Sequence, residues 1–134
     1  MCGNGVPLAA TITGANRHDV TQLVPLVDAV PPVRGRRGRP RRRPRRVLGD
    51  RAYGSRRHRR ELRRRHIRLQ AATRGAPHGS GLGTERWVVE RTIAWLHANR
   101  RLRVRYDRRD DIHHAFLTLA MIKVCGSILF DGYC

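Results

Sequence analysis

Two acidic residues, Asp50 and Glu90, stand in settings where carboxylates often bind metal ions. Asp50 ends the short apolar run Val47-Leu48-Gly49, and a turn sequence follows it. A carboxylate between a strand and a turn is typical of a site at the carboxyl end of a sheet strand. Glu90 lies in an amphipathic segment among basic residues. Carboxylate oxygens suit magnesium, which proteins commonly share with the phosphates of a substrate.

Phosphoryl transfer on DNA commonly uses two divalent cations held by carboxylates, one at the attacking oxygen and one at the leaving oxygen. Such a site normally contains three or more acids, whereas the residue patterns here support only Asp50 and Glu90. Structural alternatives stay open for both. Asp50 could be a turn former or a helix cap, and Glu90 could form a solvated ion pair with Arg86, which is the commoner origin of this spacing.

The segment around Glu90 has the periodicity of a helix with two faces. One stripe, which is polar, contains Arg86, Glu90, Ala94 and His97. The opposite stripe is mostly apolar and contains Val88, Val89, Thr92, Trp95 and Leu96. This pattern predicts a helix over residues 84–101 with Glu90 between two basic groups.

The charge of the chain indicates a polyanionic partner. Its 29 basic residues against 10 acidic ones give a net charge of +19, and Lys123 is the sole lysine. Self-repulsion of this size is costly for a compact fold unless a polyanion neutralises it. Nucleic acid is the first candidate, and an anionic membrane surface is a distant second. Arginine suits bidentate contacts with phosphate, although a GC-rich genome also favours it.

Residues 31–46 carry nine arginines, four prolines and no acid. A segment of this composition cannot bury a core, and we expect an extended, mobile loop. It is either a solvated linker or a loop that follows DNA phosphates, and the second interpretation is favoured. The predicted phosphate contacts in it are Arg36, Arg37, Arg39, Arg41, Arg42 and Arg43.

The order of the predicted elements indicates an α/β fold. Strands are expected at residues 6–13, 47–49 and 67–71, and helices at 20–30, 55–66, 84–101 and 111–125. Asp19 and Gln22 resemble a capping box at the first helix. The last helix is predicted to be buried, because its apolar run is too short for a membrane span and contains Lys123 and Gly126. Its predicted inner face consists of Ile112, Phe116, Leu119 and Ile122.

The cysteines and the start of the chain indicate a cytoplasmic protein. Cys2, Cys125 and Cys134 have no zinc-site spacing, and such scattered cysteines suit a reducing compartment. No signal peptide pattern precedes the domain. A turn at Gly3-Asn4-Gly5 before the strand at 6–13 would normally follow a partner strand. The pattern therefore predicts that the chain lacks an N-terminal strand.

Several motifs resemble bacterial insertion-sequence transposases of the Asp-Asp-Glu (DDE) superfamily, which have a ribonuclease H-like catalytic domain. The main ones are Asp50-Arg51-Ala52-Tyr53 and the stretch from Arg86 to Leu96. Further similarity lies at residues 5–8, 16–19 and 35–40. The resemblance covers essentially the whole chain, residues 1–134, as part of a catalytic domain. It implies a mixed sheet flanked by helices, with the N-terminal strand or strands missing.

The resemblance also implies roles for individual residues. Asp50 matches the second catalytic acid of the family and Glu90 the third, and both would bind Mg²⁺ or Mn²⁺, with two ions in the complete site. Predicted DNA contacts on the glutamate helix are Arg86, Arg91 and His97. Residues expected near the site are Asn16, His18, Asp19 and Tyr53. The sequence departs from the family pattern at His97, where a lysine is usual, and at Gly83, where a tyrosine is usual.

The first catalytic acid of the family has no match in the chain, since Asp19 lies in a loop after the third family strand. The chain is therefore expected to be the C-terminal part of a transposase domain and inactive alone. Its expected partners are double-stranded DNA, a second copy of itself and an upstream-frame fragment, in the bacterial cytoplasm on the nucleoid. A decayed gene copy, a non-enzymatic basic DNA-binding protein and an RNA-associated basic protein remain alternatives.

Overall fold

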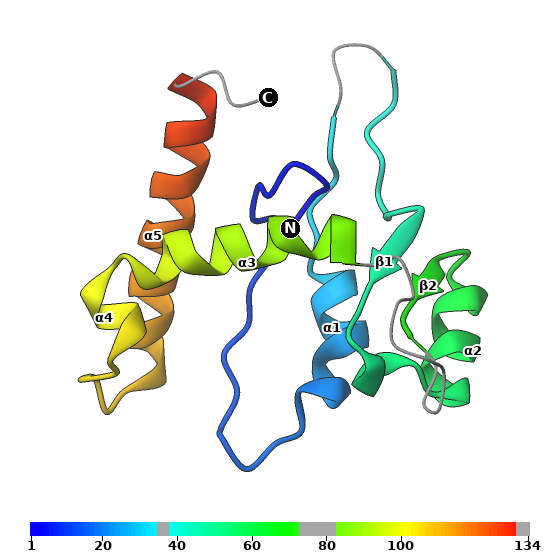
Figure 1. Ribbon diagram of the computed structural model, residues 1–134, viewed down its shortest axis with the longest axis horizontal. Coiled ribbons are helices and arrows are strands. Elements are labelled where there is room, and N and C mark those ends of the chain that lie inside the picture. The colour runs from blue at the N-terminus through cyan, green and yellow to red at the C-terminus, as the bar shows by residue number, and fades with distance from the viewer. Residues whose placement is uncertain (35–37, 73–82, 131–134) are drawn as a thin grey trace. The chain divides into compact units, whose positions relative to one another are not determined.

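The computed structural model describes residues 1–34, 38–72 and 83–130, with side chains from residue 87 onward in the last range. The chain forms two compact units. One consists of Met1–Ile12 and Gly81–Cys134, and the other of Thr13–Ser80. We call them the terminal unit and the central unit. The fold is helix-rich with a small parallel sheet (Figure 1).

The central unit is built around two short parallel strands, β1 (Arg46–Leu48) and β2 (Arg68–Gln70). Their register pairs Val47 with Leu69. Side chains alternate along a strand, so Val47 and Leu69 share one face of the pair. That face contributes to a core whose buried members are Leu23, Leu62, Ile67 and Leu69. The strands predicted at 47–49 and 67–71 are therefore confirmed to within one residue at each end.

Helix α2 (Arg56–Arg64) connects the two strands and has defined caps at both ends. The Ser55 hydroxyl oxygen accepts a hydrogen bond from the backbone N–H of His58 at the N-terminus. At the C-terminus, the N–H of His66 bonds to the carbonyl of Arg63, and that of Ile67 to the carbonyl of Leu62. These two bonds form a Schellman motif. Because Leu62 and Ile67 are both buried in the core, the motif also fixes the turn from α2 into β2.

The first helical region differs from the prediction of one helix over 20–30. A 3₁₀ helix, η1 (Asp19–Gln22), leads into the short helix α1 (Leu23–Asp28). The predicted capping box is wrong, because His18 is the N-cap of η1 and makes no side-chain capping bond. Pro25 fits within the first turn of α1, where its missing N–H has no intrahelical partner to lose. Leu23 anchors this region in the central core.

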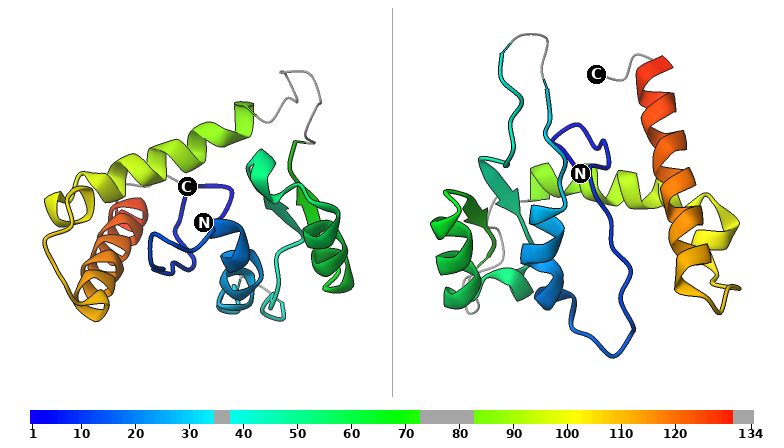
Figure 2. Two further views of the ribbon diagram at one scale, coloured as in Figure 1. Left: turned by 90° about the horizontal axis from the view of Figure 1, so that it is seen from below. Right: turned by 180° about the vertical axis from the view of Figure 1, so that it is seen from behind.

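The terminal unit contains α3 (Gly83–His97), α4 (Arg100–Arg103) and α5 (Asp110–Phe130). The structure divides the helix predicted over 84–101 into α3 and α4, because the backbone of Asn99 is extended. Figure 2 shows α5 crossing α3 at a steep angle, with α4 joining them, and each pair of these helices is in contact. The buried residues of α5 are Ala120, Val124 and Ile128.

Helix α5 differs from the prediction in length and orientation. It extends to Phe130, and Ile112, Leu119 and Ile122 of the predicted inner face are exposed. Most positions of this helix are apolar, so hydrophobic periodicity could not identify the face that packs. By length and composition α5 could also cross a membrane, so the expectation that the run is too short is wrong. A mostly buried core helix of a soluble protein passes the same test, whereas 17% of the apolar window of α5 is buried, and length and composition alone do not assign α5 to either environment.

The N-terminal segment forms the predicted turn but not the predicted strand. The N–H of Cys2 bonds to the carbonyl of Val6, and the N–H of Gly5 to the carbonyl of Cys2. Residues 6–13 have no strand assignment. No strand among the described residues pairs with this segment, and apolar, β-branched sequence alone cannot satisfy the backbone hydrogen bonds of a strand.

Candidate active site

Asp50 lies two residues after the end of β1, at the strand end where the sequence placed it. It is the N-cap of the 3₁₀ helix η2 (Arg51–Tyr53), and its Oδ1 accepts a hydrogen bond from the Arg51 backbone N–H at 2.6 Å. The side chain is exposed. The capping alternative is therefore observed, and the second carboxylate oxygen still has no hydrogen-bond partner among the described residues.

Tyr53 lies in an acidic environment within the central unit. Its ring packs against the central core. Burial raises the pKa of the Tyr53 phenol, and the negative charges of Asp19 and Asp50 raise it further. The structure therefore brings Asp19, Asp50 and Tyr53 into one neighbourhood, although 31 positions separate the two acids in the numbering. Of the other residues predicted near the site, Asn16 and His18 are exposed in the segment before α1.

Glu90 lies on the exposed side of α3. Ala94 and His97, which share its stripe, are also exposed, whereas Thr92 on the opposite stripe is fully buried. Glu90 forms no hydrogen bond or ion pair with any residue whose side chain is described. The ion pair considered between Glu90 and Arg86 cannot be assigned, since the Arg86 side chain lies outside the described residues. The predicted two-faced helix is confirmed except at Val89, which is 36% exposed.

Arg91, predicted to contact DNA, contacts groups within its own unit. Its guanidinium carbon lies 4.5 Å from the ring centroid of Trp87 and 4.7 Å from that of Trp95. One of its terminal nitrogens donates a hydrogen bond to the Asn4 carbonyl at 3.0 Å. A guanidinium stacked between two aromatic rings gains cation–π stabilisation. These contacts give Arg91 a structural role that a phosphate would have to displace.

One antiparallel bridge joins Val33 to Arg41 within the arginine-rich loop. The N–H and carbonyl groups of Val33 and Arg41 exchange hydrogen bonds of 2.9 and 2.8 Å. Composition did not predict this backbone pairing. The predicted phosphate contacts with described positions are all exposed, namely Arg39, Arg41, Arg42 and Arg43. Arg36 and Arg37 lie outside the described residues.

Asp50 and Glu90 have the chemistry of metal ligands, but two acids are fewer than such a metal site normally contains. Both are exposed carboxylates, which are suitable oxygen ligands for a hard divalent cation. Asp50 belongs to the central unit and Glu90 to the terminal unit, and each is described within its own unit. No group of three histidine, cysteine, aspartate or glutamate side chains that could hold a metal occurs among the residues with described side chains.

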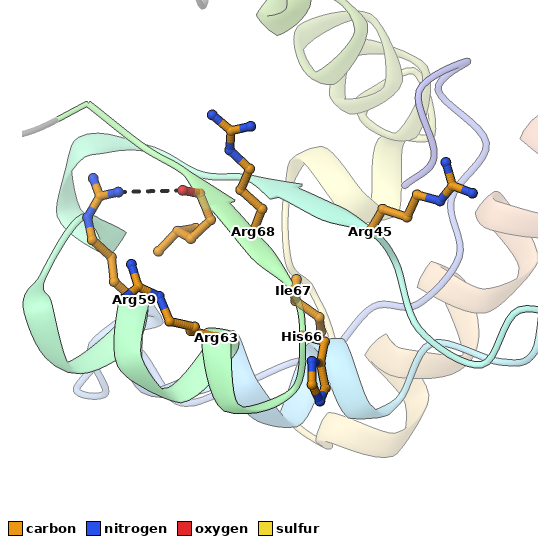
Figure 3. A pocket seen from close by; sticks show the side chains of 7 residues that line it. Arg45, Arg59, Arg63, His66, Ile67 and Arg68 are labelled. Atoms are coloured by element: carbon orange, nitrogen blue, oxygen red, sulfur yellow. Dashed lines mark hydrogen bonds between the residues drawn. The ribbon is translucent and has the colours of Figure 1, made fainter.

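Two features of functional interest were not singled out in the sequence. Gly5 and Thr92 are joined by a hydrogen bond of 2.9 Å that fixes the N-terminal turn against the glutamate helix. The other feature is an arginine-lined pocket beside α2 and β2, with Arg63 and Arg68 in its wall (Figure 3). Sequence offered one signal for the pocket, the density of arginine in the predicted helix at 55–66, but not which side chains would gather.

Comparison with known proteins gives a consistent family assignment. Residues 2–125 match the family described as "Transposase DDE domain". The chain is 61% identical over 126 residues to a Burkholderia cepacia protein named "Putative transposase for insertion sequence element IS402". The match covers 94% of this chain and 60% of that relative, so the chain spans less than two thirds of the relative's length. No solved structure matches the chain significantly. On the family match and this identity, the chain belongs to the transposases with a DDE domain.

Proposed function

We propose that this chain contributes Asp50 and Glu90 to a metal-dependent site that cleaves and joins DNA strands at the ends of an insertion sequence. The observation that carries the proposal is the place of Asp50 two residues after β1 of a parallel strand pair, within the family match. Glu90, exposed on α3 in the same match, supplies the second carboxylate. The complete domain would have the ribonuclease H-like sheet of the family, of which β1 and β2 would form part.

Transposases of this family use divalent metal ions, and we propose Mg²⁺ or Mn²⁺ here, with two ions in the complete site. When bound, such ions activate the attacking oxygen and stabilise the leaving oxygen of a phosphodiester. The residues of this chain would hold the ions through the carboxylates of Asp50 and Glu90. Since such sites normally need a third acid, we expect the 134-residue chain to be inactive alone.

Phosphate contacts in this proposal come from exposed basic residues. The arginines at 39 and 41–43 would neutralise backbone phosphates of double-stranded DNA. His97 would contact phosphate from the same face of α3 as Glu90, about two turns further along the helix. Arg36, Arg37 and Arg86 have the same proposed role. Three expectations about partners and location remain predictions: self-association, an upstream-frame partner fragment, and a place on the bacterial nucleoid in the cytoplasm. The packing of α5 in a protein core without membrane contact is also a prediction.

The test compares this chain with a fusion to the part of the Burkholderia cepacia relative that lies outside the matched region. Each protein receives Mg²⁺ or Mn²⁺ and duplex DNA carrying the terminal repeats of the element. We expect metal-dependent cleavage by the fusion, none by this chain alone, and loss of cleavage in Asp50→Asn and Glu90→Gln. Asp28→Asn is the matched control, because Asp28 is an exposed acid whose surface ion pair with Arg65 is worth little.

Two outcomes would contradict the proposal. Cleavage by neither protein would remove the enzymatic assignment, and cleavage that survives both substitutions would remove these two carboxylates from the site. Salt-sensitive binding without cleavage, indifferent to both acids, would instead support the non-enzymatic DNA-binding alternative.

A further inference from the structure

A pocket of about 420 Å³ lies in the central unit between the C-terminal half of α2 and the start of β2. Its floor is formed by Ile67 and Leu69, both buried. The polar residues that line it are all basic, namely Arg45, Arg59, Arg63, His66 and Arg68 (Figure 3). No carboxylate lines this pocket, so the fields of its cations are not cancelled by acids within it.

The arginines of this pocket divide into one structural residue and three available ones. Arg59 donates hydrogen bonds to the carbonyls of Gly54 at 3.1 Å and Ala71 at 2.7 Å, and so fastens α2 to the end of β2. The side chains of Arg45, Arg63 and Arg68 are exposed and form no hydrogen bond or ion pair with another residue in the described part of the chain. Three guanidinium groups at one surface therefore retain their full capacity to bind anions.

The directions of these side chains indicate the size of the anion. Figure 3 shows Arg45, Arg63 and Arg68 pointing in different directions from the pocket wall, without convergence on one point. A single small anion is held by convergent donors, whereas separated cations suit successive phosphates of a polymer. The arrangement thus favours a polyanion backbone over free phosphate.

His66 adds a fourth basic side chain to those of the three available arginines. Its φ of 57° lies in the left-handed region at the end of α2, where glycine is the usual residue. The Schellman motif that ends α2 accounts for this conformation, so it is the side chain of His66 that supports a function here. The exposed imidazole at this position lines the pocket and can donate a hydrogen bond to a phosphate oxygen.

We propose that this pocket is a binding site for the phosphate backbone of double-stranded DNA, contacted by Arg45, Arg63, Arg68 and His66. The choice of DNA as the polyanion rests on the proposed function, whereas the site itself rests on the local geometry. It adds a DNA contact on α2 and β2 to those predicted on the arginine-rich loop and the glutamate helix.

The test measures binding of the full chain to a short fluorescein-labelled duplex by anisotropy over a series of salt concentrations. EDTA is present throughout, so metal-dependent chemistry cannot contribute. The triple variant Arg45→Gln/Arg63→Gln/Arg68→Gln is compared with the matched control Arg17→Gln/Arg56→Gln/Arg60→Gln. The three control arginines are exposed, lie in the same unit, line no pocket described here and lose the same charge.

We expect the pocket variant to lose roughly tenfold or more in affinity near physiological salt, and to reduce the salt slope by about 2–3, since each phosphate contact contributes about 0.9. The control should change the slope by less than about 1. Equal losses in both variants would overturn the proposal, because they would reflect net charge alone. A loss for duplex RNA as large as that for DNA would overturn the assignment to DNA.

His66→Gly keeps the test interpretable if the triple variant folds poorly. Glycine relieves the left-handed strain, so this variant should be at least as stable as the parent while binding DNA about two- to threefold more weakly. Unchanged affinity in a stable His66→Gly protein would exclude the imidazole from the site. Because Asp50→Asn and Glu90→Gln should bind like the parent in EDTA, failure of this site and failure of the catalytic proposal are distinguishable.

Discussion

The hydroxyl of Thr92 donates a hydrogen bond to the carbonyl oxygen of Gly5 at 2.9 Å, across 87 positions of sequence. Thr92 is the one fully buried polar side chain described in the terminal unit. The Val88 carbonyl, one turn earlier in α3, shares the same hydroxyl donor. Glu90, the proposed metal ligand, lies two residues before Thr92 on the same helix. The contact between Thr92 and Gly5 therefore holds this helix against the N-terminal turn.

The contact predicts that Gly5→Ala destabilises the terminal unit. Gly5 has a φ of +87°, and a Cβ there would lie 2.9 Å from the Thr92 hydroxyl. The backbone conformation alone should cost about 1–2 kcal/mol, and displacement of α3 should add to it. Thr92→Val should cost about 1 kcal/mol, because it leaves the Gly5 carbonyl without its donor. Chemical denaturation followed by circular dichroism measures both, with Gly3→Ala as control, since a Cβ at Gly3 meets nothing within 4 Å.

Arg91 is predicted to stabilise α3 rather than to serve mainly as a DNA contact. Arg91→Met removes two cation–π contacts, each worth about 0.5–1 kcal/mol near a surface, and the hydrogen bond to Asn4. Trp87 and Trp95 are the two tryptophans of the chain, so their fluorescence reports the change directly. Arg103→Met, at an exposed position of α4, should alter the free energy of unfolding by less than about 0.5 kcal/mol. Equal stability of the two variants would contradict the structural role.

Tyr53 is predicted to ionise at higher pH than an ordinary tyrosine, because burial and then Asp19 and Asp50 raise its pKa. Absorbance titration of the parent against Tyr53→Phe isolates this phenol. Asp19→Asn and Asp50→Asn should each lower the midpoint, whereas Asp28→Asn should leave it unchanged. If neither substitution changed the midpoint, the inference that Asp19 and Asp50 lie close to Tyr53 would be wrong.

The same pKa shift predicts how stability changes at alkaline pH. Since the folded pKa of Tyr53 lies above its unfolded value, the folded state retains the proton longer, and the stability it contributes is lost as pH rises through the folded pKa. Thermal unfolding measured on either side of the ordinary tyrosine range should therefore show a smaller alkaline loss in Tyr53→Phe than in the parent.

His66→Gly is predicted to raise the free energy of unfolding by roughly 0.5–1 kcal/mol, because glycine adopts the left-handed conformation at no steric cost. His66→Ala removes the imidazole but keeps the strained backbone, so it should gain nothing. Urea denaturation of the two variants separates backbone strain from loss of the ring. A gain in His66→Ala equal to that in His66→Gly would show that the ring, not the backbone, is unfavourable.

Local patterns correctly predicted β1, α2 and β2. Each depends on signals within a few residues, namely the apolar run before Asp50, the run rich in arginine and histidine at 55–66 and the alternation at 67–71. The prediction of a strand at 6–13 was wrong because strand formation does not depend on local signals alone. A strand forms only when another strand satisfies its backbone hydrogen-bonding groups. The packed face of α5 was wrong because an almost uniformly apolar helix has no face that sequence can distinguish.

The candidate site also divides into features that sequence predicted and features that only tertiary packing determined. Sequence by itself determined that Asp50 follows a strand, that Glu90 lies on the polar face of a helix and that the family is that of the DDE transposases. The tertiary structure decided that Arg91 bonds to the Asn4 carbonyl 87 positions away and that Asp19 and Asp50 share the surroundings of Tyr53. It also decided that three arginines and His66 gather beside β2. Periodicity and motif spacing report on residues within one or two helical turns of each other. These contacts instead join residues that are far apart in sequence, and only the packing of the folded chain brings them together.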